Sequence, residues 1–402
     1  MSPYRRGRVV LLGVAFLGFM SLGLPDGVLG VAWPSIRATF GVPLGHLGVL
    51  LAAAMTGYLV SSFCAGWLVT RLGVGPVLAW SSVLIVVNSW GYALASAWAV
   101  MVACAVLAGL GAGAIDAGIN AFVATRFPAG VVTWLHASYG VGAMLGPLLM
   151  TAMLSSGLGW RWGYGFLGLA IAGMAVVFAL TLDLWRLAPG HHGNARDSAG
   201  LAATLARAPV WIGVLLFFLY TGLEVTAGQW SYTLLTEGRG LAPAMAGVAV
   251  AAYWASLTTG RVVAGALTSR VPARRLLLAA MILAPVGGAL VWAANGPVLA
   301  VVGLMVLGAA LAPIYPLLTA DTPRRVGPRY ATHAIGFQVS AAYLGAAAIP
   351  GAVGVGATWQ GLDVVGASLV VVALSVLVLH SASLRFGSRR CIAAASVGWH
   401  RA

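Results

Sequence analysis

The sequence predicts an all-α membrane protein that crosses the bilayer twelve times, and three observations lead to this fold class. Of the 402 residues, 61% are hydrophobic and only 7% are charged, and the mean hydropathy is +0.97. An ordinary soluble domain has about 25% charged residues. Apolar blocks of about 20 residues, the length that spans the hydrocarbon core, recur along the whole chain. Because these blocks are continuous rather than alternating, they indicate helices and exclude a transmembrane β-barrel.

The apolar blocks divide into six before a long polar connection and six after it. The predicted transmembrane spans are residues 9–33, 45–69, 76–97, 99–124, 132–156, 161–184, 210–235, 244–268, 273–294, 298–319, 333–357 and 362–384. We therefore expect an N-terminal six-helix bundle (1–185), a cytoplasmic linker (186–208), a C-terminal six-helix bundle (209–386) and a cytoplasmic tail (387–402). The first block is too long for the apolar region of a signal peptide, so we expect no cleaved leader.

The arginines predict the orientation of the chain. All basic residues are arginines, and with a cytoplasmic N-terminus 18 of the 22 fall on cytoplasmic segments. Only Arg37, Arg161 and Arg239 fall on outer loops, and Arg261 lies inside a span. Because positive residues favour the cytoplasmic side, both termini are expected there, in a multi-pass protein of the inner (plasma) membrane. The net charge of +14 thus indicates lipid head groups as the partner and not nucleic acid.

The two halves repeat each other at a spacing of 199 residues. Segment 66–71 (GWLVTR) follows the second span, and segment 265–270 (GALTSR) follows the eighth, with Gly, Leu and Arg at equal positions. At the same spacing Gly109 corresponds to Gly308, in the fourth and tenth spans. The sequence therefore predicts two pseudo-symmetric six-helix bundles.

Three carboxyl groups lie inside the predicted spans: Asp26, Asp116 and Glu224. A charge at the bilayer centre costs about 2.5–3.5 kcal/mol on insertion scales, so such residues normally face a bundle interior or a wet cavity. Burial also favours the protonated form of a carboxyl group, which allows proton exchange near physiological pH. The single intramembrane cation, Arg261, cannot neutralise three acids. We therefore predict that all three acids couple transport to protons.

Small residues surround these acids. Asp116 shares one helix face with Asn120, beside a stripe formed by Gly109, Gly113 and Ala117, where another helix can approach closely. Asp26 and Glu224 lie 198 residues apart, and each is flanked by glycines, so we expect irregular helix at both positions. Segments 142–147 and 348–351 contain Gly and Pro, and we expect them to provide bends and close contacts between the halves.

The other polar residues at depth suit a small polar solute. Amide groups and aromatic rings hold a sugar through its hydroxyls and its C–H face, and the predicted substrate-binding residues are Asn88, Asn120, Gln229, Gln338, Trp230 and Tyr139. His136, Arg261, Arg71 and Arg270 are assigned to a gate or an ion pair, with Arg261 either structural or in contact with an anionic substrate. The cysteines and histidines have no metal-ligand spacing, so we expect no metal and no cofactor.

The loop after the second span resembles the signature of the major facilitator superfamily. Gly66, Leu68, Arg71 and Gly73 fit that signature, whereas Thr70 stands where Asp is usual, which weakens the expected charge-relay gate. The resemblance covers nearly the whole chain. It implies a major facilitator fold and alternating access, in which the two halves rock about a central site.

Within that superfamily the chain is similar to the fucose–galactose–hexose:proton symporter group. Four segments carry this similarity: Pro25-Asp26-Gly27, Asp116 with Asn120, residues 136–140 (HASYG), and Gly222-Leu223-Glu224 with Trp230. In that group the acids of spans 1 and 4 bind proton and sugar. The resemblance implies these roles for Asp26 and Asp116.

Two transport functions follow as hypotheses. The first is import of a sugar or similar polar metabolite by proton symport, and the second is export of a drug or secondary metabolite by proton antiport. The exporter signature is only partly present, as Gly142, Gly146 and Pro147, and the fourth span has no Arg before Arg126. A non-transporting sensor would not need three buried acids. Neither an ATP-binding loop nor an enzymatic constellation is found, so we expect no enzyme. The expected partners are lipid, protons and a small-molecule substrate, with the chain acting as a monomer.

Overall fold

The computed structural model describes residues 3–127, 129–186 and 200–398, and all of its regular structure is helical. The N-terminal half contains α1 (Pro3–Phe40), η1 (Leu44–His46), α2 (Leu47–Leu72), α3 (Val74–Leu94), α4 (Trp98–Arg126), α5 (Ala129–Ser155), α6 (Trp160–Leu180) and η2 (Leu182–Arg186). The C-terminal half contains α7 (Leu201–Leu205), α8 (Ala208–Thr233), η4 (Leu234–Gly238), α9 (Pro243–Leu267), α10 (Ala273–Trp292), α11 (Pro297–Leu311), α12 (Ile314–Val326), α13 (Pro328–Gln360) and α14 (Asp363–Gly398). Residues 187–199 of the predicted linker lie outside the described residues.

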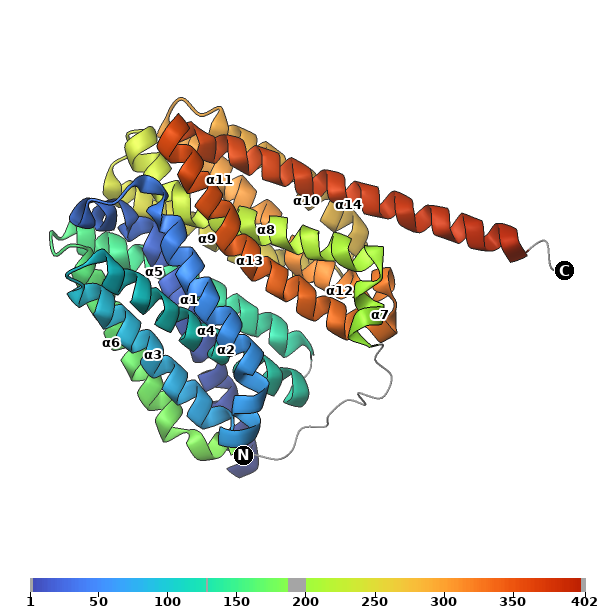
Figure 1. The fold of residues 1–402 in the computed structure, drawn as a ribbon, viewed down its shortest axis with the longest axis horizontal. Helices are drawn as coiled ribbons and strands as arrows, with labels where there is room; N and C mark the ends of the chain where they lie inside the picture. The colour runs from blue at the N-terminus through green and yellow to red at the C-terminus, as the bar shows by residue number, and fades with distance from the viewer. Residues whose placement is uncertain (1–2, 128, 187–199, 399–402) are drawn as a thin grey trace.

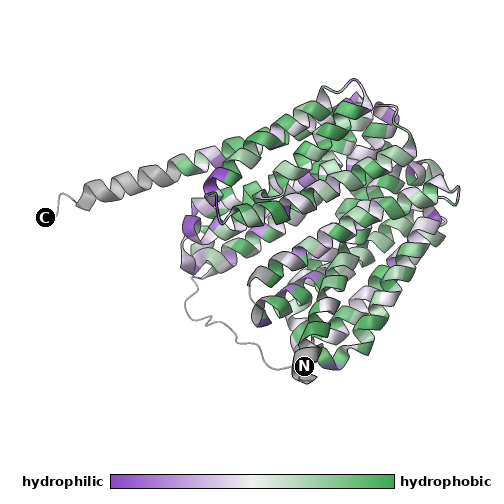
Figure 2. Ribbon diagram, turned by 180° about the vertical axis from the view of Figure 1, so that it is seen from behind, coloured by the Kyte–Doolittle hydropathy of each residue, from purple (hydrophilic) through white to green (hydrophobic). Residues whose placement is uncertain are grey.

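The predicted membrane-protein fold is confirmed. Within the described ranges, eleven helical segments are long and apolar enough to cross a membrane. Helix α9 is not among them, but it covers the predicted span 244–268 and contains Arg261. Figure 2 shows apolar residues along most of the length of the helices, which suits contact with lipid. The cytoplasmic position of the termini stays a prediction.

The two halves have the same internal packing. In the first half α1 packs on α5, α2 and α3 on α4, and α3 on α6. In the second half α8 packs on α13, α9 and α10 on α11, and α10 on α14, which are the equivalent pairs. A Cβ atom at Gly109 would lie 1.7 Å from the Ala54 carbonyl oxygen, and one at Gly308 would lie 2.7 Å from the Tyr253 carbonyl oxygen. Gly109 and Gly308 are 199 residues apart, and so are their contacts Ala54 and Tyr253, so the predicted repeat is present in the structure.

The halves meet chiefly where α5 packs on α9, α2 and η1 pack on α13, and α1 packs on α8. In Figure 1 the two halves lie together at the end away from η2 and α7 and separate towards these two short helices. We call the end near η2 and α7 the linker side and the opposite end the far side. On the far side Gly48 lies against Gly351, the Gly45 backbone N–H donates to Thr358 Oγ1 at 3.1 Å, and Arg37 pairs with Glu237 at 2.6 Å.

The predicted tenth span lies within one apolar helical segment, Pro297–Val326, in which a turn at Pro313 separates α11 from α12. Two expectations about local structure are wrong. The first concerns α1 and α8, which run without interruption past Asp26 and Glu224, where irregular helix was expected. Their glycines serve close packing instead: Gly27 lies against Pro147 and Gly222 against Ile349.

The second wrong expectation concerns Gly142 and Gly146. These glycines approach the Met20 and Leu24 carbonyl oxygens of α1, so they bring together two helices of one half and not the two halves. In segment 348–351 the expectation holds, because Gly351 contacts Gly48 of the other half.

Candidate functional site

Asp116, on α4, accepts three hydrogen bonds from neutral groups. Tyr58 Oη of α2 donates to Asp116 Oδ2 at 2.5 Å, and Asn120 Nδ2 donates to Oδ1 at 2.9 Å. Tyr343 Oη of α13 donates to Oδ2 at 3.1 Å, and it comes from the opposite half. The Tyr58 and Tyr343 rings are stacked, with centroids 3.8 Å apart. The Asp116 carboxylate therefore lies on the boundary between the halves.

The predicted stripe of small residues explains how Tyr58 reaches Asp116. Gly109 and Gly113 leave room for the backbone of α2, and a Cβ at Gly113 would lie 2.5 Å from the Tyr58 carbonyl oxygen. Because side chains are missing at these two positions, α2 and α4 approach closely enough for the Tyr58 hydroxyl to bind the carboxylate.

Asp26 is an exposed side chain in the middle of a buried helix segment. Its neighbours Gly27 and Val28 are buried, while Asp26 itself is accessible to solvent. Tyr139 Oη of α5 donates to Asp26 Oδ2, and Gln229 Nε2 of α8 donates to the Asp26 backbone oxygen at 2.9 Å. The Asp26 carboxylate is thus also placed where α1 and α5 meet the opposite half.

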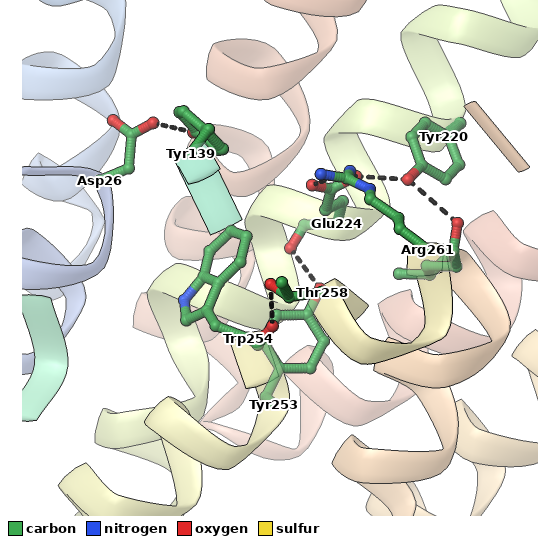
Figure 3. Close-up of polar contacts among 9 residues, drawn as sticks. Asp26, Tyr139, Tyr220, Glu224, Tyr253, Trp254, Thr258 and Arg261 are labelled. Atoms are coloured by element: carbon green, nitrogen blue, oxygen red, sulfur yellow. Dashed lines mark hydrogen bonds and ion pairs between the residues drawn. The ribbon is translucent and has the colours of Figure 1, made fainter. Parts of the chain in front are cut away.

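Glu224, on α8, has a different environment that lies within the C-terminal half (Figure 3). Arg261 Nη2 of α9 lies 3.2 Å from Glu224 Oε1 and 3.4 Å from Oε2. Tyr220 Oη donates to Glu224 Oε2 at 2.5 Å, and Tyr253 Oη donates to the Glu224 backbone oxygen at 2.9 Å. The Glu224 and Arg261 side chains are only 10% and 17% exposed, so they form a buried ion pair.

Asp26 is close enough to the other two acids to influence them. Asp26 lies within electrostatic range of both Asp116 and Glu224. Of these three acids, only Glu224 has a cationic partner among the described residues; the hydrogen bonds to the Asp26 and Asp116 carboxylates come from tyrosine hydroxyls and one amide. Two of the three carboxylates are therefore free of a compensating cation within this part of the chain.

The structure does not bring every predicted substrate-binding residue to these acids. Asn88 Nδ2 donates to the Cys104 backbone oxygen at 2.9 Å and ties α3 to α4. Trp230 is fully buried, and its Nε1 donates to the Pro350 oxygen of α13 at 2.9 Å. Gln338 is also buried and accepts a hydrogen bond from Thr322 at 3.0 Å. These three side chains join helices, whereas Asn120, Gln229 and Tyr139 contact the acids.

The predicted gate residues lie in three different places. Arg261 belongs to the buried ion pair described above. His136 is exposed on α5, and its ring lies 5.4 Å from that of Phe19. Arg71 is exposed at the linker-side end of α2 and stacks over the Trp67 ring at 4.8 Å. Arg270 is exposed in the turn that follows α9. Their roles in gating stay predictions.

Three tyrosines that bind the acids were not assigned to the site from the sequence. Tyr220 lies four residues before Glu224, so the i, i+4 spacing on one helix face could have indicated it. Tyr58 lies 58 residues from Asp116, and no local pattern connects them. Tyr343 is one of several aromatic residues at depth, and its contact with Asp116 depends on how the halves meet.

Two six-helix halves with the carboxylates of Asp26 and Asp116 at their boundary are the architecture of a polytopic membrane transporter. The family model of the Major Facilitator Superfamily matches residues 15–350, and the chain belongs to this superfamily. Its relatives are transporters, so the prediction that the chain is not an enzyme is confirmed. The more specific resemblance to the fucose–galactose–hexose:proton symporter group stays a prediction.

Several known proteins are similar to the chain. Bypass of stop codon protein 6 of Saccharomyces cerevisiae is 23% identical over 63% of this chain. The match covers only 56% of the length of that relative. An uncharacterized MFS-type transporter of Yersinia pestis is 23% identical over 90% of this chain and 92% of its own length.

Solved structures share the fold at low identity. An inward-facing, occupied bacterial homolog of the human lysosomal transporter Spinster has a TM-score of 0.78 at 14% identity, covering 97% of this chain and 98% of its own. A D-xylose-proton symporter has a TM-score of 0.71 at 17% identity, covering 92% of this chain and 97% of its own.

Proposed function

We propose that the protein is a proton-coupled secondary transporter that imports a sugar or similar small polar metabolite by symport. The observation that carries the proposal is the environment of Asp26 and Asp116. Both carboxylates lie where the halves meet, and within the described residues both are bound by neutral donors and by no cation. A carboxylate in such a place gains or loses a proton without breaking an ion pair, so it can link proton movement to the positions of the halves.

The proposed mechanism is alternating access. The bundles formed by residues 1–185 and 209–386 rock about the region of the three acids, with Asp116 and Asp26 as proton carriers. One proton moving down about 100 mV supplies about 2.3 kcal/mol, which sustains a solute gradient of about 50-fold. Orientation with both termini in the cytoplasm of an inner membrane, and action as a monomer, belong to the same proposal.

A polar substrate is favoured by the groups beside the acids. Asn120 and Gln229 carry amides, Tyr139 carries a hydroxyl, and all three contact Asp116 or Asp26. Such donors and acceptors suit the hydroxyls of a sugar. The D-xylose-proton symporter with the same overall fold supports the idea that this architecture can couple a sugar to protons.

The test combines a substrate screen with matched variants. Purified protein is screened by thermal shift against sugars, polyols, nucleosides and antibiotics, and the best hit is used in proteoliposomes. We expect Asp116→Asn to abolish proton-driven accumulation while exchange of preloaded substrate continues, because the amide cannot carry a proton. Asp183→Asn changes an exposed acid at the end of the N-terminal half and should leave accumulation unchanged. Accumulation in Asp116→Asn at the wild-type level would contradict the proposal.

Export of a drug by proton antiport is the second candidate. The observation that favours it is the tight packing of Gly142 and Gly146 on α1, next to Pro147, because these residues are the part of the exporter signature that the chain has. The direction of proton flux decides between the two functions. Substrate addition outside should raise the external pH for a symporter, whereas a hydrophobic drug that lowers it would favour the exporter.

A further inference from the structure

Tyr343 occupies the boundary between two different parts of one face of α13. Towards the far side, Gly351, Gly354 and Thr358 of this face contact η1 and the start of α2. Towards the linker side, Thr332, Gly336 and Ser340 continue the same face, and all three are exposed. Tyr343 stacks on Tyr58 between these two parts. Along α13, the contact with the opposite half therefore ends at the stacked tyrosines, within the described residues.

The hydrogen bonds at Asp116 are unequal in a way that matters for protonation. Oδ2 accepts from both Tyr58 and Tyr343, while Oδ1 accepts from Asn120. When Oδ2 gains a proton it becomes a hydroxyl, and a neutral acid holds hydrogen bonds less strongly than a carboxylate does. Two tyrosine hydroxyls cannot both continue to donate to that oxygen with the same strength.

The bond from Tyr343 is the one that is lost more easily. Tyr58 is fixed beside Asp116 by the close packing of α2 on Gly109 and Gly113, and its bond of 2.5 Å is the shorter. Tyr343 belongs to the other half, and its bond is 3.1 Å long. Because the halves move relative to each other in alternating access, the Tyr343 bond can break without disturbing either half.

We propose that Tyr343 is the positioning residue through which the C-terminal half responds to protonation of Asp116. With Asp116 ionised, the Tyr343 hydroxyl binds it and holds α13 against α2 and α4, in the arrangement seen here. With Asp116 protonated, this link weakens and the contacts on the far side are free to open. The inference rests on the proposed function, because it requires Asp116 to exchange protons.

Other titratable groups near Asp116 do not account for such a link. Besides the two tyrosines, Asp26 of α1, His136 of α5 and Tyr315 of α12 lie within electrostatic range of Asp116. None of these three donates a hydrogen bond to Asp116 in the described structure. All of them remain in place when the Tyr343 hydroxyl is removed, so a variant at Tyr343 isolates its contribution.

The experiment measures the distance between the halves and needs no substrate. Spin labels are attached at Leu72→Cys and Ser269→Cys, two exposed positions on the linker side of opposite halves, after Cys64, Cys104 and Cys391 have been replaced. Pulsed electron paramagnetic resonance then records the distance distribution in nanodiscs between pH 5 and pH 8. We expect a long distance at high pH, because the halves separate towards the linker side in this structure (Figure 1), and a growing short-distance population as the pH falls.

Two tyrosine variants separate the proposed link from a general loss of hydrogen bonds. Tyr343→Phe keeps the stacked ring and removes only the hydroxyl, and it should shift the population ratio about tenfold towards the short distance at pH 8 and make it insensitive to pH. Tyr58→Phe is the matched control, because it removes the shorter bond but keeps the link between the halves. It should retain a pH response.

The outcomes distinguish the inference from the proposed function. If Tyr343→Phe responds to pH as the wild type does, while Asp116→Asn does not respond, the role of Tyr343 is overturned and proton coupling stands. If the wild type shows no pH response and Asp116→Asn matches it, the proposed function itself is overturned. The double variant Asp116→Asn with Tyr343→Phe adds a further test. Both changes act through the bond between Tyr343 and Asp116, so their effects on the population ratio should not add, and additive shifts would contradict the link.

Discussion

Asp116 and Glu224 are both acids within spans, and their surroundings differ in charge and in position. Glu224 forms an ion pair with Arg261, and both residues belong to the C-terminal half. Asp116 is bound by two tyrosines and one asparagine, and one of the tyrosines belongs to the opposite half. The pair around Glu224 joins α8 to α9, whereas the cluster around Asp116 joins the halves to each other.

The difference shows that burial of an acid does not by itself identify a proton carrier. The Glu224 carboxylate, neutralised by Arg261, joins α8 to α9, and protonating Glu224 would leave Arg261 without its anionic partner. An acid that is held by neutral donors can lose or gain its charge at lower cost. Asp116 is therefore the better candidate for proton exchange, and the coupling role of Glu224 stays a prediction.

The largest expected effect comes from breaking the ion pair. Arg261→Gln leaves the Glu224 carboxylate buried without a cation, and we expect a loss of about 3–5 kcal/mol in the free energy of unfolding. Denaturant unfolding in detergent, followed by tryptophan fluorescence, measures this loss. The double variant Glu224→Gln with Arg261→Gln removes both charges and should recover most of the stability. A single variant as stable as the wild type would mean that the pair is not structural.

A smaller loss is expected from separating α2 and α4. A Cβ at Gly109 would lie 1.7 Å from the Ala54 carbonyl oxygen, so Gly109→Ala forces the helices apart and moves Tyr58 away from Asp116. Overpacking of this kind costs about 1–3 kcal/mol. Gly173→Ala in α6 is the matched control, because no atom lies within 4 Å of the added methyl group. Equal melting temperatures for the two variants would contradict the close packing.

Asp116→Asn should separate stability from function. The amide can still meet Tyr58, Tyr343 and Asn120 through hydrogen bonds, so we expect the free energy of unfolding to change by about 1 kcal/mol or less. Arg261→Gln, by contrast, should lower the free energy of unfolding by the larger amount given above. Unfolding measured on both variants under one condition tests the comparison, and a loss in Asp116→Asn as large as that in Arg261→Gln would remove the distinction between the two acids.

Much of the fold could be predicted because its signals are local. The length of the apolar blocks predicted the transmembrane spans, and the equivalent positions of Gly109 and Gly308 predicted the two similar halves. The glycines near Asp26 and Glu224 were misinterpreted, since the absence of a side chain suits both a flexible helix and a close helix contact. Only the packed structure distinguishes these uses.

The site was predicted less completely than the fold. The three acids and Arg261 were identified because a charge within an apolar span is conspicuous. Tyr58, Tyr220 and Tyr343 were not assigned to these acids. Tyr343, for example, lies 227 residues from Asp116 and meets it only when the halves come together. The sequence likewise offered no way to decide which acid pairs with Arg261, since that choice depends on the positions of α8 and α9.

The smallest expected effect concerns the far side, where the halves are joined by an ion pair instead of by a carboxylate with neutral donors. Arg37 of α1 pairs with Glu237 of η4 at 2.6 Å, and these side chains are 29% and 36% exposed. Because water screens such a pair, Arg37→Gln should lower the free energy of unfolding by less than about 1 kcal/mol. Its effect should also decrease as salt rises, which unfolding at low and high ionic strength would measure. An effect larger than that of Asp116→Asn, independent of salt, would show that the far-side pair and not the Asp116 cluster is the main polar link between the halves.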